Sequence, residues 1–172
     1  MLRKPEGAGS QPRLNKHIHP LRLNLNVIEA YLGLKGDGME LLSTNVKSQF
    51  FREGSLLLYG TCVKAEAPGV FREFSKGRTP LSVCLEMEHM DKVGFKIATI
   101  FMTSDPKEMT VLTMDGSPHC LQLHLAAEQA KRIAKSEVNL RHFVIEKGES
   151  VEVSQDAVET ARHLSRIQKL LS

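Results

Sequence analysis

Two histidines stand one residue apart near the start of the chain. His17 and His19 lie in the stretch NKHIHPLRLNLNV, directly before a regular alternation of apolar and polar residues. In a strand, this spacing puts both imidazoles on one face, about 7 Å apart. With a third ligand, such a pair could hold a divalent metal ion. The same residues could equally belong to a basic tail that enters the fold.

The triplet His17-Ile18-His19 resembles the central motif of rolling-circle replication initiators and relaxases. In that family a bound metal polarises the scissile phosphate and a helical tyrosine attacks it. The resemblance therefore implies nuclease chemistry, with Tyr31 as the nearby nucleophile. The family carries this motif on an inner strand that follows earlier strands, whereas an irregular segment with two prolines precedes it here. We therefore interpret the histidines as part of a basic arm, without metal ligation.

Two further groups have the residue types of a metal or acid–base site. Cys120 and His124 are four residues apart on an expected helix, with His119 adjacent, so their side chains could converge on zinc. Glu86 and Glu88 share one face of an expected strand and could serve acid–base or Mg²⁺ chemistry. Neither group has further ligands at a defined spacing. A small buried cysteine and a solvated strand face explain them better.

The sequence lacks a recognisable cofactor or nucleophile motif. The segment GLKGDG has three glycines without the strand, glycine and helix context of a dinucleotide-binding loop, and it lacks the Gly-Lys-Ser/Thr of a P-loop. The cysteines Cys62, Cys84 and Cys120 are far apart and form no CxxC pair, so we expect reduced thiols and a cytoplasmic protein. We therefore predict a non-enzymatic binding protein with no catalytic residue, no metal and no cofactor.

Positive charge is concentrated at the N-terminus. The net charge of the whole chain is +3. Residues 1–36 hold six Lys or Arg against two Glu, whereas the rest of the chain holds 17 basic against 18 acidic residues. Residues 1–20 have no hydrophobic period, which predicts a flexible basic arm. The alternation from Leu21 to Val27 predicts a first strand, so we divide the chain into this arm and a single domain over residues 21–172.

Apolar alternation continues along much of the domain. Strands are expected in five segments, 45–51, 55–65, 81–90, 95–102 and 108–114, with one or two more within 141–153. Their short connections favour an antiparallel meander. Helices are expected to begin at Ser117-Pro118 and after Ser154. The expected fold class is therefore α+β: a curved antiparallel sheet or partly open barrel of about six strands, packed by C-terminal helices.

Basic and aromatic residues are interleaved in the connection over residues 68–80. With the arm, they suit a single-stranded or flexible nucleic acid, whose phosphates meet cations and whose bases stack on aromatic rings. The predicted nucleic-acid-binding residues are Arg3, Lys4, Arg13, Lys16, Arg22, Phe71, Arg72, Phe74, Lys76 and Arg78. The alternative is a protein-interaction module that homo-oligomerises or binds a partner through exposed sheet edges. No apolar run is long enough for a membrane span, so we expect no membrane partner.

Overall fold

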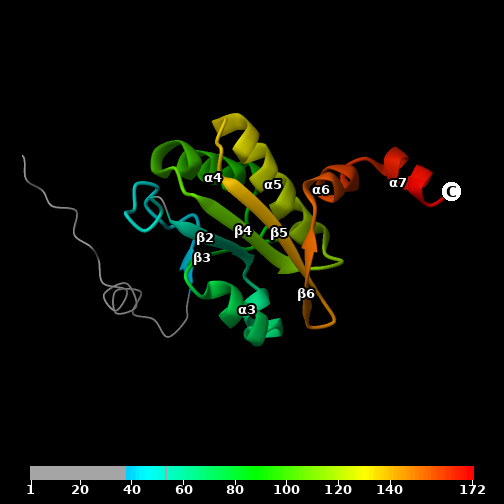
Figure 1. Ribbon diagram of the computed structural model, residues 1–172, viewed down its shortest axis with the longest axis horizontal. Helices are drawn as coiled ribbons and strands as arrows, with labels where there is room; N and C mark the ends of the chain where they lie inside the picture. The colour runs from blue at the N-terminus through cyan, green and yellow to red at the C-terminus, as the bar shows by residue number, and fades with distance from the viewer. Residues whose placement is uncertain (1–37, 53) are drawn as a thin grey trace, which may run out of the picture.

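The computed structural model describes residues 38–52 and 54–172, and its centre is a six-stranded sheet (Figure 1). The strands are β1 (Met39–Glu40), β2 (Ser55–Gly60), β3 (Thr79–Val83), β4 (Glu108–Met114), β5 (Asn139–Glu146) and β6 (Glu149–Val153). Their order in the sheet is β1-β3-β2-β4-β5-β6. The pairings from β1 to β5 are parallel, and β6 runs antiparallel to β5. The predicted arm 1–20 and strand 21–27 lie outside the described residues.

Helices cover both faces of this sheet. They are α2 (Val63–Glu66), α3 (Pro68–Ser75), α4 (Met90–Ser104), α5 (Pro118–Ala134), α6 (Gln155–Ala161) and α7 (Leu164–Leu170). Figure 1 shows α4 and α5 together on one face, α3 on the other, and α6 and α7 leading away beyond β6. Within the described part of the chain, no helix is both long and apolar enough to cross a bilayer.

The central strand β2 shows how the sequence builds two cores. Leu56 and Leu58 pack with the side chains of α4 and α5, whereas Leu57 and Tyr59 pack with Phe71 of α3. Successive side chains of a strand point to opposite faces, so an unbroken apolar run is buried on both sides. Such a run is typical of a parallel strand between two layers of helices, and it explains why β2 lies near the centre of the sheet.

The expected antiparallel sheet is wrong, because several expected strands and loops are helices or turns. Residues 95–102 lie within α4, whose buried side chains Val93, Ile97, Ile100 and Phe101 follow helical spacing. β-Branched residues in this segment suit both a strand and a buried helix, and the apolar run alone does not separate them. A helix between two strands forms a crossover, which makes the strands parallel instead of antiparallel.

Three other expected elements also change. The segment expected to be a loop over 68–80 contains α3 and the start of β3. The expected strand over 81–90 ends at Val83, and residues 84–89 turn the chain into α4. Residues 45–51 form turns. The strand over 108–114 is confirmed as β4, and the segment 141–153 holds β5 and β6.

The two expected helix starts are confirmed. Ser117 precedes α5 and its hydroxyl accepts a hydrogen bond from the backbone N–H of Cys120. Ser154 precedes α6 and its hydroxyl accepts one from the N–H of Ala157 at 3.2 Å. The last helix differs from expectation, because it breaks near His163 into α6 and α7.

Replacing Ser154 with alanine should lower the free energy of unfolding by about 1 kcal/mol, because one N–H at the start of α6 loses its acceptor. Urea denaturation followed by circular dichroism measures this change. Ser154→Asp is the matched control, since its carboxylate can accept the same hydrogen bond and should keep most of the stability. An equal loss in both variants would contradict the capping role of Ser154.

Candidate functional site

The carboxyl ends of β2 and β4 mark a change of direction in the path of the chain across the sheet. From β2 the chain passes through α2 and α3 to β3 on one side, then through α4 to β4 on the other. In open α/β sheets, ligands bind outside the carboxyl ends of the strands at such a topological switch point. The residues after β2 and β4, Thr61-Cys62 and Asp115-Gly116-Ser117, are therefore candidate ligand contacts.

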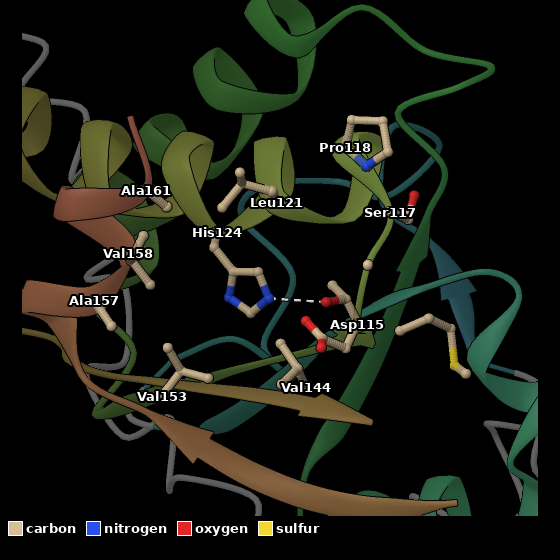
Figure 2. Close-up of a pocket in the computed structure, with 13 residues that line it drawn as sticks. Asp115, Ser117, Pro118, Leu121, His124, Val144, Val153, Ala157, Val158 and Ala161 are labelled. Atoms are coloured by element: carbon tan, nitrogen blue, oxygen red, sulfur yellow. Dashed lines mark hydrogen bonds between the residues drawn. The ribbon is translucent and has the colours of Figure 1, made fainter. Parts of the chain in front are cut away.

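A cavity of about 480 Å³ opens beside this edge, between the loop from β4 to α5, the strands β5 and β6, and helix α6. Most of its lining is apolar: Met114, Pro118, Leu121, Val144, Val153, Ala157, Val158 and Ala161. Polar atoms come from Thr113, Asp115, Ser117 and His124. Figure 2 shows His124 reaching from α5 and Asp115 from the loop toward the same side of the cavity. The cavity therefore has an apolar body and one polar end.

A chain of buried hydrogen bonds leads from this polar end into the protein. Thr113 Oγ1 lies 2.9 Å from His124 Nε2 (Figure 2), and His124 Nδ1 lies 2.9 Å from His142 Nδ1. His142 Nε2 lies 2.9 Å from Glu128 Oε1, and the amide of Gln155 donates to Glu128 Oε2 at 3.1 Å. Thr113, His124, Glu128 and His142 are all buried. This series of hydrogen bonds thus connects the cavity to α6 through residues of α5 and β5.

The chemistry of the acceptors fixes the direction of these bonds when both rings are neutral. An ionised Glu128 only accepts, so His142 donates from Nε2. A neutral His142 then accepts at Nδ1, so His124 donates from Nδ1 and accepts at Nε2 from the hydroxyl of Thr113. This one arrangement of protons gives both ring nitrogens of His124 and of His142 a hydrogen-bond partner. In the part of the protein that the structure describes, no buried side-chain nitrogen or oxygen is left without a partner.

Burial keeps both imidazoles neutral. Burial lowers the pKa of His124 to about 3, and the neighbouring His142 adds to this effect. The pKa of His142 is also lowered by burial, although its hydrogen bond and charge interaction with Glu128 act in the opposite direction. The contact between His142 and Glu128 is therefore a hydrogen bond from a neutral ring at neutral pH, although its length would also fit an ion pair.

Three thiols meet at the switch point. Cys62 follows β2, Cys84 follows β3 and Cys120 lies in the first turn of α5, and all three line a cavity of about 110 Å³. A Cβ atom on Gly60 would lie 3.7 Å from Cys62 Sγ and 3.9 Å from Cys120 Sγ, so both sulfur atoms flank the end of β2. All three cysteines are free. The sequence alone does not reveal this group, because the order of strands brings together residues that are far apart in the chain.

The zinc group considered from the sequence does not form. His124 is committed to Thr113 and His142, whereas the thiol of Cys120 lies near Cys62. Over residues 38–52 and 54–172, no three His, Cys, Asp or Glu side chains are arranged to hold a metal ion. Glu86 and Glu88 lie on the turn after β3, not on a strand. His17 and His19 lie outside the described residues.

The two phenylalanines of the predicted nucleic-acid-binding set pack against the sheet, Phe71 buried and Phe74 partly buried. Phe71 is only 3% exposed and its ring lies 4.7 Å from that of Tyr59, between centroids. The ring of Phe74 meets that of Phe143 at 4.9 Å in an edge-on arrangement. Both rings attach α3 to the sheet, and Phe71 is too deeply buried in this structure to stack on a base.

The cations of that set differ in whether their charge is paired within the protein or exposed to solvent. Arg78 pairs with Glu108 at 3.1 Å and donates to the backbone oxygen of Phe74. Arg72 and Lys76 are exposed. The remaining residues of the set, Arg3, Lys4, Arg13, Lys16 and Arg22, lie outside the part described. Binding of nucleic acid by this set, like homo-oligomerisation or partner binding through a sheet edge, stays a prediction.

Comparison with known proteins agrees with the parallel sheet. A family model for a Rossmann-like domain matches residues 48–171, which include every element from β2 to α7. No curated protein and no solved structure matches the chain. The match covers well over half of the 172 residues. The chain therefore belongs to the Rossmann-like domain family.

Proposed function

We propose that this domain binds a small organic molecule in the 480 Å³ cavity beside β4 and β5. The observation that carries the proposal is an apolar cavity whose polar groups converge at one end, at the carboxyl edge of a Rossmann-like sheet. Cavities of about 300–1,000 Å³ with this distribution of polar groups are typical of small-molecule sites. The body of the ligand would contact Leu121, Val144 and Val158.

The polar end of the cavity favours a ligand that donates hydrogen bonds. Asp115 offers carboxylate oxygens, whereas His124 Nε2 is already paired with the hydroxyl of Thr113. The start of α5 is poorly suited to a phosphate, because Pro118 has no N–H and the N–H of Cys120 donates to Ser117. A negative charge there would also face Asp115. These features support an amine or a hydroxyl compound with an apolar body.

Two probes with the same apolar body test this preference. Phenethylamine should shift the methyl NMR signals of Leu121, Val144 and Val158, whereas 3-phenylpropionate should bind more weakly because its carboxylate meets Asp115. Asp115→Asn should weaken binding of the amine by about 10-fold, since the ammonium group then meets a neutral amide oxygen instead of a charged carboxylate. Tighter binding of the carboxylate than of the amine would contradict the proposed ligand class.

A cavity-filling variant tests the location of the site. Ala161 lines the cavity from α6, so Ala161→Phe should abolish the shifts caused by the amine. Ala65→Phe is the matched control, because Ala65 is exposed on α2 and is not part of the lining. Both variants gain the same ring on a helix. Unchanged binding of the amine in Ala161→Phe would show that the ligand binds outside this cavity. The absence of any shift in the unmodified protein would contradict binding of this ligand class.

A further inference from the structure

The three cysteines at the switch point, Cys62, Cys84 and Cys120, line a second, smaller cavity. We propose that Cys62 and Cys120 form a redox-active dithiol, which a small-molecule disulfide converts into an intramolecular disulfide, while Cys84 stays reduced. This proposal does not rest on the proposed ligand. It rests on the position of three thiols from three different parts of the chain around one small cavity.

Geometry selects Cys62 and Cys120 from the three thiols. Their sulfur atoms flank the same point, the Cβ position that Gly60 leaves empty, at 3.7 and 3.9 Å. Cys120 also has a stronger electrostatic effect on the Cys62 thiol than Cys84 has. A disulfide needs Cβ atoms about 3.5–4.5 Å apart. The exposed Cys62 side chain can turn toward Cys120 without disturbing the core, because it lies on the surface after β2.

The exposed thiol is the one that meets an oxidant from solution. Cys62 is exposed, whereas Cys120 and Cys84 are partly buried. The Cys62 thiolate attacks one sulfur of the small disulfide, forms a mixed disulfide and releases one small thiol, which takes up the proton from Cys62. The sulfur of Cys120 then attacks Cys62 Sγ and releases the second small thiol with the second proton. Two protein thiols are oxidised and one small disulfide is reduced to two thiols.

The environment of Cys62 makes the first step depend on pH. Partial desolvation raises the pKa of the Cys62 thiol although its residue is exposed, and the neighbouring Cys120 and Cys84 raise it further. The reactive thiolate is therefore scarce at neutral pH, and the first step should become faster as the pH rises. Closure removes both ionisable thiols from this crowded position. The new bond would tie the turn after β2 to the first turn of α5 across the 110 Å³ cavity.

Mass spectrometry of the full chain tests the pairing. The reduced protein is incubated with oxidised glutathione, its remaining thiols are blocked with N-ethylmaleimide, and it is digested without reductant. We expect loss of maleimide labelling at Cys62 and Cys120, a peptide cross-linked through these two residues, and full labelling at Cys84. The same incubation in guanidinium chloride should lose this selectivity, because the pairing depends on the native fold.

Variants separate the roles of the three thiols. Cys84→Ser should still form the link, whereas Cys120→Ser should stop at a glutathione adduct on Cys62. Cys120→Ala serves as a second variant if a hydroxyl near the start of α5 disturbs folding. A link that contains Cys84, a wild-type protein that stops at mixed disulfides, or equal selectivity in denaturant would overturn the proposal.

Discussion

Replacing Glu128 with leucine should lower the free energy of unfolding by about 2–3 kcal/mol. The Nε2–H of His142 would lose its acceptor at 2.9 Å, and this ring is only 2% exposed, so water cannot replace the carboxylate. The amide of Gln155 would lose its acceptor as well. Reversing the direction of every hydrogen bond from Thr113 to His142 would not restore the lost pairing. It would replace an unpaired donor at His142 Nε2 with an unpaired acceptor at the same atom.

Glu128→Gln is the matched control for this prediction. Its amide oxygen can still accept from His142, so the buried ring keeps a partner, and only the contact with Gln155 must rearrange. Urea denaturation at pH 7.5 should therefore show a loss in Glu128→Gln of less than half that in Glu128→Leu. Equal losses, or a stable Glu128→Leu protein, would mean that the hydrogen-bond chain contributes little to stability.

The sequence correctly predicts the helices whose first turn is marked by a capping serine. Ser117-Pro118 and Ser154 begin α5 and α6 as expected, because a capping hydroxyl acts on the next few residues and needs no tertiary contact. The sequence predicts α4 wrongly, because its apolar residues fit a strand as well as a buried helix. The unbroken run Leu56–Tyr59 was the available indication of a parallel strand, since an antiparallel strand with one wet face alternates.

The candidate site depends on sheet order, which local patterns do not contain. His142 lies beside Val111 in the parallel register of β4 and β5, which puts it within reach of His124. His124 stood out in the sequence only as a partner for Cys120, four residues earlier. In the structure these two side chains have different partners: His124 contacts His142 of β5, whereas Cys120 lies near Cys62, which follows β2. A buried network of this kind follows from topology, and helical spacing alone suggests the wrong pair.

Acidification from pH 7.5 to pH 5 should destabilise the protein by about 2 kcal/mol through His124 alone. The pKa of His124 is about 3 in the folded protein, because burial opposes its charge, against 6.5 for an ordinary histidine. As the pH falls below 6.5, the unfolded chain takes up a proton that the folded protein refuses, so unfolding becomes easier. The loss continues until the pH approaches 3. The lowered pKa of His142 acts in the same direction.

Two variants separate this titration from a general loss of stability. His124→Asn removes the titrating ring, so its free energy of unfolding should fall less steeply between pH 7.5 and pH 5 than that of the wild type. Leu58→Val, a change at a fully buried position of β2, should lower stability at every pH and keep the wild-type slope. Urea denaturation across this pH range measures both. A full wild-type slope in His124→Asn would show that the acid sensitivity arises elsewhere, because a residue that no longer titrates cannot link stability to pH.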